Sequence, residues 1–236
     1  MKDVFLADAH LRDPGDENYR RLLTFLEGLR GKTRTLYLLG DIFEFWIGYR
    51  HAVFSAYVPV LEALRRLRED GTELVFVEGN HDFHMGPFFE EVLGCRVIAD
   101  DAVVDVDGLR IYLAHGDLAD PADSGYRLLR RLLHSRFTLL LARLVTPDLP
   151  WAISRWMGRQ SRKQYVTRSV RRQPEELILA HARRRFSEGH QAVVTGHFHH
   201  PLLRSDPAGT VVALGDWIDQ YSYAVLENGA FRMESA

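Results

Sequence analysis

The chain has 236 residues, of which 46% are apolar and 26% are charged, and its formal net charge is −2. These proportions are ordinary for a globular domain and exclude disordered, collagen-like and disulfide-scaffold proteins, while the length allows one large α/β domain or a domain with an insertion. The only cysteine, Cys95, excludes an intramolecular disulfide, which fits a reducing compartment.

The first ten residues, MKDVFLADAH, lack the apolar region of a signal peptide. The longest apolar candidates, such as FTLLLARLV at residues 137–145, are broken by arginine and fall short of the ~18 apolar residues that a spanning helix needs. We therefore expect a cytoplasmic protein, which could still rest on a membrane surface.

Short β-rich runs alternate with helical patterns in the first part of the chain. Strand patterns cover residues 3–10, 35–41 and 73–80, and helical patterns cover residues 18–29, 53–70 and 83–94. Strands that alternate with helices of this length imply βαβ units and a mainly parallel sheet.

Strand patterns return in the last third, on either side of a helical block. Hairpins are expected at residues 103–117 and 222–233, with turns at Asp107-Gly108 and Asn228-Gly229, and strands at 191–200 and 210–217. Because strands both precede and follow the helical block, we predict an α/β core over residues 1–125 and 190–236 and a helical insertion over 126–189 that caps the active site.

The predicted insertion is strongly basic. From Asp120 to His190 there are fifteen Lys and Arg against six Asp and Glu, a net charge of +9, so the rest of the chain carries −11. This asymmetry favours an anionic partner, although solvated helix faces would explain single arginines. Leucines rather than stacking aromatics separate the arginines, so no nucleic acid is expected.

Every apolar strand pattern ends in a candidate metal ligand. In chain order these are Asp8 and His10, Asp41, Asn80, His115, and His197 with His199. Each motif alone is weak, but ligands of open α/β sheets bind beyond the carboxyl ends of the strands, where these side chains would converge. So many clustered carboxylates and imidazoles would be costly to bury without a cation.

The stretch VVTGHFHHP, residues 193–201, holds three histidines in four positions. If the strand continues past Gly196, His197 and His199 point to one side and His200 to the other. A pair of neutral imidazoles suits a metal ion, and His200 is expected to be a bystander.

These motifs, D-x-H, G-D, G-N-H, H and G-H-x-H in this order, resemble those of the calcineurin-like metallophosphoesterases. The resemblance implies a layered α-β-β-α sandwich with a helical insertion and two divalent metal ions. It assigns Asp8, His10, Asp41 and His199 to one ion, and Asp41, Asn80, His115 and His197 to the other, with Asp41 bridging. Ligands without thiolates fit Mn, Fe or Zn, and we expect Mn²⁺.

Two cations about 3.5–4 Å apart would acidify a water and neutralise charge that develops on a phosphoryl group. His81 follows the predicted ligand Asn80 and is expected to be the catalytic residue, as transition-state stabiliser or proton donor to the leaving group. Its own partner could be Asp82 or Glu44.

Three longer segments, residues 40–48, 114–130 and 214–222, together with the helical insertion, are most similar to the UDP-2,3-diacylglucosamine hydrolases of lipid A biosynthesis. This resemblance implies attack of metal-bound water at the α-phosphorus of the pyrophosphate, which gives UMP and 2,3-diacylglucosamine 1-phosphate (lipid X). The implied substrate contacts are Asn80, His81, Asp123, Ser161, Arg168 and His197. The best-known members carry Arg in place of His81, Asn in place of Tyr165 and Lys in place of Arg168.

The insertion also carries apolar stripes. They comprise Leu128, Leu129, Leu132, Leu133, Leu139, Leu140, Leu141 and Leu144, followed by Trp151, Ile153, Trp156 and Met157. Such segments could line an acyl-chain chamber and rest on the anionic cytoplasmic face of the inner membrane, with Trp151 or Trp156 at the interface. The other interpretation is that most of these leucines form the insertion's own core.

Two alternative functions stay open. A phosphoesterase of the same fold could act on a nucleotide or on another lipid pyrophosphate, although an apolar insertion argues against a nucleotide alone. A non-catalytic metal-binding scaffold should lack a ligand or His81, and neither is missing. No obligate protein partner is evident.

Overall fold

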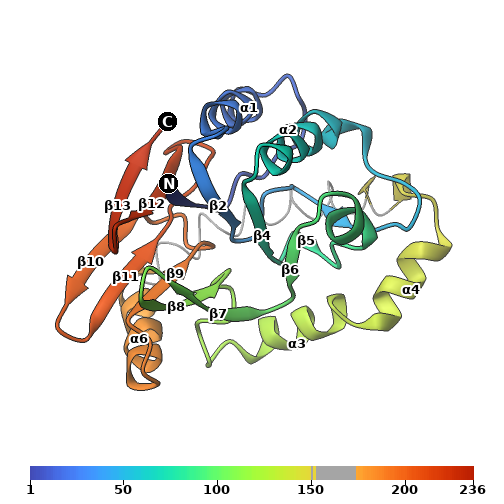
Figure 1. Ribbon diagram of the computed structural model, residues 1–236. Coiled ribbons are helices and arrows are strands. Elements are labelled where there is room, and N and C mark those ends of the chain that lie inside the picture. The colour runs from blue at the N-terminus through green and yellow to red at the C-terminus, as the bar shows by residue number, and fades with distance from the viewer. Residues whose placement is uncertain (150, 153–173) are drawn as a thin grey trace.

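A computed structural model of the chain describes residues 1–149, 151–152 and 174–236. Two β-sheets form the centre of the molecule (Figure 1). In spatial order the larger sheet contains β13 (Ala230–Ser235), β12 (Ser222–Glu227), β1 (Lys2–Leu6), β2 (Thr33–Leu38), β4 (Glu73–Val77) and β6 (Arg96–Ile98). The smaller sheet contains β10 (Leu202–Asp206), β11 (Gly209–Ala213), β9 (Ala192–Thr195), β8 (Leu109–Ala114) and β7 (Asp101–Val106).

Parallel strands lie at the centre of both sheets. Strands β1, β2, β4 and β6 pair in parallel, as do β11, β9 and β8, whereas β12, β13, β10 and β7 add antiparallel edges. The prediction of a mainly parallel sheet therefore holds for these central strands, and the hairpins supply the antiparallel ones. Strands β6 and β10 were not predicted.

The central strands are buried on both faces because their alternate side chains enter different cores. In β2, Leu36 and Leu38 pack in one core, while Tyr37 joins Phe5 of β1 in the second. That second core lies between the sheets, since it also contains Val194 of β9. The chain thus builds its two sheets around one shared apolar layer.

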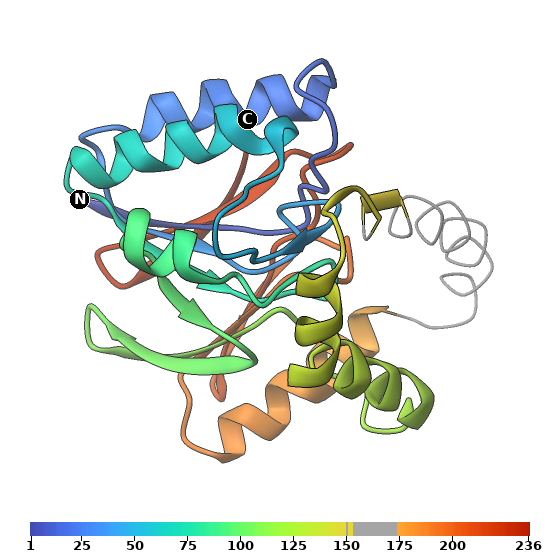
Figure 2. The same ribbon diagram turned by 90° about the vertical axis from the view of Figure 1, so that its right-hand side faces the viewer.

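Helices cover the two outer faces of the sheets. Helices α1 (Glu17–Leu29) and α2 (Val58–Glu69, preceded by the short 3₁₀ turn η1, Ser55–Tyr57) lie over the larger sheet, and α6 (Pro174–Ser187) lies over the smaller one (Figures 1 and 2). From α6, Ile178 and Ala182 pack with Val193 and Val211. The predicted layered α-β-β-α sandwich is confirmed.

Two further helices, α3 (Ser124–Leu133) and α4 (Arg136–Leu144), extend along one side of the sandwich (Figure 2). The helix predicted over residues 83–94 is wrong in extent: β5 (Asp82–Phe83) pairs with β3 (Trp46–Ile47), and only one short π-helical turn, η2 (Phe88–Val92), follows. Among the described residues, no helix combines the length and apolarity needed to cross a bilayer.

Candidate metal centre

The predicted ligands lie on loops that follow five central strands. Asp8 and His10 follow β1, Asp41 follows β2, Asn80 follows β4, His115 follows β8, and His197 and His199 follow β9. Their donor atoms form groups that could hold metal ions, because the atoms of each group lie within 4.8 Å of one another. The groups are Asp8, His10 and His199; Asp41, His115 and His197; and His10, Asp41 and His81.

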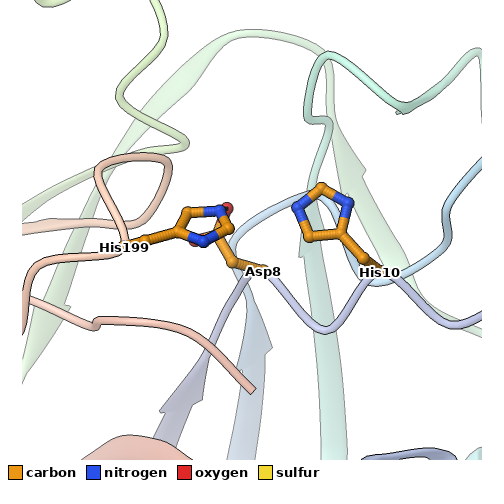
Figure 3. A group of neighbouring side chains, drawn as sticks. All are labelled: Asp8, His10 and His199. Atoms are coloured by element: carbon orange, nitrogen blue, oxygen red, sulfur yellow. Dashed lines mark ion pairs between the residues drawn. The ribbon is translucent and has the colours of Figure 1, made fainter. Parts of the chain in front are cut away.

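The first group combines residues that are far apart in the sequence. His199 places its Nε2 atom 3.4 Å from Oδ1 of Asp8, and the His10 and His199 rings are 5.4 Å apart. Figure 3 shows these three side chains directed toward a common space. Asp8 is fully buried, and its Oδ1 atom has no hydrogen-bond partner within the described ranges. A buried carboxylate oxygen of this kind is the donor that a cation would satisfy.

The second group surrounds His115, which is almost completely buried. Its Nε2 atom lies 3.5 Å from Oδ2 of Asp41, 3.1 Å from Oδ1 of Asn80 and 3.3 Å from Nδ1 of His197. Three donors from three other strand ends therefore meet at one imidazole nitrogen.

Asp41 lies between the two groups. Besides His115, its Oδ2 atom faces Nε2 of His10 at 3.7 Å and Nε2 of His81 at 4.0 Å. These distances are too long for hydrogen bonds, and the donor atoms of His10, Asp41 and His81 lie within 4.8 Å of one another, close enough to face a common ion. The Asp and His donors thus fit divalent cations, which the metallophosphoesterase family uses, on both sides of Asp41.

Burial sets the protonation of the site. It lowers the pKa of His10, and neighbouring His81 lowers it further. Burial alone would raise the pKa of the Asp41 carboxyl, but nearby imidazoles, His115 foremost, hold it well below its usual value. A neutral imidazole beside an ionised carboxylate is the combination that binds a metal.

The ligand loops have an unusual backbone. Nine non-glycine residues in the described part of the chain have positive φ, and five of them are predicted ligands: Asp8, His10, Asp41, His197 and His199. This conformation is rarely adopted by non-glycine residues and is concentrated at functional sites. The expectation that the strand continues past Gly196 is wrong, because β9 ends at Thr195 and both histidines lie on a turn.

Gly196 shows why a glycine precedes the two histidines. A Cβ atom at this position would lie 2.6 Å from Oδ2 of Asp8 and 2.6 Å from Cβ of Ala7. The missing side chain lets the turn approach Asp8, whose Oδ2 accepts the His197 N–H at 2.7 Å. The glycine of this motif therefore serves close packing at the site.

His81 is paired with Glu44, one of the two residues expected, but through the backbone of Glu44 and not its carboxylate. Its Nδ1 atom lies 2.9 Å from the backbone carbonyl oxygen of Glu44. Asp82 points elsewhere: its buried carboxylate accepts the N–H groups of Asp41, Ile42, Phe43 and Gly79 at 2.7 to 3.1 Å. Asp82 thus fixes the turn that carries Asp41, and the His81 ring is oriented by the main chain.

Outer partners orient three of the imidazoles, as is usual for histidines that bind metals. Nδ1 of His10 lies 3.7 Å from the Glu44 carboxylate, Nδ1 of His199 lies 3.7 Å from the carboxylate of Asp216, and Nδ1 of His115 pairs with the Leu39 carbonyl at 2.8 Å. Asp216 was not among the predicted site residues. The available signal was its place in LGDW, directly after a strand, as Asp41 follows one in LLGD.

Of the predicted substrate contacts, Asp123 is the N-cap of α3, where its Oδ1 accepts the Tyr126 N–H at 3.1 Å. Asn80, His81 and His197 lie at the metal centre. Ser161 and Arg168 lie outside the described residues, as do Tyr165, Ile153, Trp156 and Met157.

The leucines of α3 and α4 are mostly exposed. Leu128, Leu129, Leu132, Leu140, Leu141 and Leu144 are 46 to 73% accessible, so the interpretation that most of the stripe is the insertion's core is wrong for these six. Trp151 is not at an open interface, because its ring stacks on Phe54 at 5.1 Å and contacts Tyr57.

Comparisons with known proteins define the class. A family model described as calcineurin-like phosphoesterase matches residues 1–201, and the chain belongs to this family. Proteins named UDP-2,3-diacylglucosamine hydrolase resemble it along most of its length. One from Pseudomonas putida (strain F1) is 32% identical and covers 91% of this chain and 90% of its own. One from Aeromonas salmonicida is 33% identical and covers 99% of this chain and 93% of its own.

Among solved structures, that of an archaeal phosphodiesterase matches all of both chains with a TM-score of 0.54 at 12% identity. At this identity the match shows the fold alone.

Proposed function

We propose that the protein is a metal-dependent diphosphatase that hydrolyses the pyrophosphate of UDP-2,3-diacylglucosamine at the α-phosphorus, releasing UMP and 2,3-diacylglucosamine 1-phosphate. The observation that carries the proposal is the convergence of Asp and His donors on both sides of Asp41. The resemblance to UDP-2,3-diacylglucosamine hydrolases over 90% or more of both chains supports the substrate.

The proposed ligands of one divalent ion are Asp8, His10, Asp41 and His199, and those of the other are Asp41, Asn80, His115 and His197, with Mn²⁺ as the expected ion. When bound, two such ions acidify a water and neutralise charge on the phosphoryl oxygens. The protein's part is to hold Asp41 ionised beside His10 and His197, whose pKa values are lowered by burial.

His81 is the proposed catalytic residue. Its Nδ1 faces the Glu44 carbonyl, an acceptor, so this nitrogen carries a proton and Nε2 is the atom left to face substrate. Nε2 lies on the Asp41 side of the ring, at the edge of the metal centre. A ring that is also protonated at Nε2, the imidazolium, could stabilise charge on the scissile phosphate or give that second proton to the leaving phosphate.

Residues 126–189 are the proposed cap over this centre, in which α6 returns the chain to the core. We further propose that the exposed leucines of α3 and α4 meet acyl chains and the surface of the inner membrane from its cytoplasmic side. The exposed Arg136, at the start of α4, would face anionic head groups.

The proposal is tested by incubating the protein with UDP-2,3-diacylglucosamine and Mn²⁺ and measuring UMP. Asp41→Ala should abolish turnover, because both ions would lose a shared oxygen. His199→Ala should lower turnover by about 10²-fold or more, whereas its neighbour control His200→Ala should stay near the wild type. If a simple phosphodiester is cleaved but UMP is not released, the enzyme acts on another phosphoester; if Asp41→Ala still turns over, the two-ion site is refuted.

A further inference from the structure

The loop that follows His115 is held by side chains of two helices from the predicted insertion. From α3, Tyr126 donates its hydroxyl to Oδ2 of Asp117 at 2.7 Å, and Arg127 donates to the carbonyl oxygen of Leu118 at 3.1 Å. From α6, Arg184 donates to the carbonyl oxygen of Ala119 at 2.6 Å. Each of the three residues 117–119 is therefore contacted.

Arg130 also contacts this loop, through an ion pair with Asp117. Its Nε atom lies 2.6 Å from Oδ2 of Asp117, and its Nη1 atom donates to Oδ1 of Asp100 at 2.6 Å. The side chains of Arg130 and Asp117 are only 8% and 4% exposed. The buried guanidinium thus lies between two carboxylates, that of the buried Asp117 and that of the exposed Asp100.

The C-terminal end of α3 packs against the segment that follows β4 of the larger sheet. The His134 ring, at the C-cap of the helix, stacks on Phe83 with centroids 4.5 Å apart, and its Nδ1 lies 3.9 Å from the buried Glu78. Glu78 and Phe83 lie on either side of Asn80 and His81 in the sequence. Helix α3 thus spans the ligand loops of the two sheets, with Arg130 near the middle of the span.

A lipid-linked nucleotide would have to contact the metal centre and α3 at the same time. Its diphosphate would lie at the metal centre, while its sugar and acyl chains would meet Asp123 at the start of α3 and the leucines of the same helix. A small phosphodiester would need the metal centre alone. The relative position of α3 and the metal centre therefore matters for the first substrate and not for the second.

We infer that Arg130 is a positioning residue: by holding Asp117 and Asp100 together, it sets α3 against the His115 loop and so selects for the large substrate. This inference rests on the proposed function. Arg127, Arg130 and Arg184 all contact other parts of the protein, so part of the basic charge of the insertion serves the protein's own structure.

The test compares Arg130→Lys with Arg131→Lys, which makes the same change at the exposed next position. Lysine keeps the charge, so the variant should fold, but its single ammonium cannot reproduce the two-sided contact. We expect the KM for UDP-2,3-diacylglucosamine to rise roughly tenfold, since a displacement of about 1 Å can cost up to 10²-fold. Turnover of bis(p-nitrophenyl) phosphate with Mn²⁺ should stay within about twofold of wild type, because the ligands are untouched.

Two further measurements separate positioning from general stability. Tyr126→Phe removes only the hydroxyl contact to Asp117 and should raise the same KM in the same direction. Hydrogen exchange of residues 116–119 should speed up in Arg130→Lys and not in Arg131→Lys. Equal KM values for the two lysine variants, or an equal loss on both substrates, would overturn the inference; absence of UMP with the wild type would overturn it together with the proposed function.

Discussion

Asp82 is the residue whose role changed most between sequence and structure, and its removal gives a quantitative test. Its two oxygens accept four buried backbone N–H groups, two at each oxygen. Asp82→Asn keeps the shape but leaves one accepting oxygen, so two N–H groups lose their acceptor and face an amide NH₂. Each unsatisfied buried group costs about 1–3 kcal/mol, so the expected loss is about 4 kcal/mol. That is a large part of the ~5–15 kcal/mol that stabilises a typical domain.

The assay is urea unfolding followed by circular dichroism, with EDTA present so that a change in metal affinity does not contribute. The matched control is Asp105→Asn, an exposed carboxylate on β7, which should change stability by less than about 0.5 kcal/mol. A loss below about 1 kcal/mol in Asp82→Asn would refute the assignment of Asp82 as the acceptor that shapes the Asp41 turn.

Two more predictions follow from buried positions. A Cβ atom at Gly79 would touch the Asp41 carboxylate and lie 2.5 Å from the Asp41 backbone nitrogen, so Gly79→Ala should lower phosphodiester turnover by about 10²-fold. The control Gly28→Ala, which has open space around it, should leave turnover unchanged. Similar turnover rates for the two variants would contradict this prediction. Burial, and after it the positive charge of Arg185, lowers the pKa of His181 to about 4. In the unfolded chain the pKa of a histidine is about 6.5. Stability from this neutral ring is present above pH 6.5 and falls toward pH 4, by about 2 kcal/mol between pH 7.5 and 5. His181→Leu should lose that part of the pH dependence in urea titrations, and an unchanged slope would count against it.

The clustering of the proposed ligands could be predicted from the sequence because their position depends on strand ends, and a buried parallel strand is visible as a run of apolar residues. Asp41 and His115 follow such runs directly, and the sheet brings their ends together. Glu44 could be named as one of two candidate partners of His81, but the sequence carries no signal that the contact is made by its backbone carbonyl. The turn conformation of His197 and His199 was also out of reach, since positive φ at a histidine is set by packing around Gly196.

The orientation of α3 explains why its leucines could be mistaken for core residues. Tyr126 and Arg130 are four residues apart and share one face of the helix, and that face points into the protein toward Asp117. Leu128, Leu129 and Leu132 lie on the rest of the surface and are 46 to 59% exposed. One charge of the helix, Arg130, is therefore buried on the inward face, while Arg127 and Arg131 are exposed together with the leucines. Periodicity shows that a helix has two faces but not which one is buried; here the inward face carries the ion pair of Arg130 with Asp117, two residues beyond His115. An exposed apolar stripe of this kind indicates a binding surface. The same rotation of α3 that places Arg130 beside the His115 loop thus presents the leucines outward, where the proposed lipid would meet them.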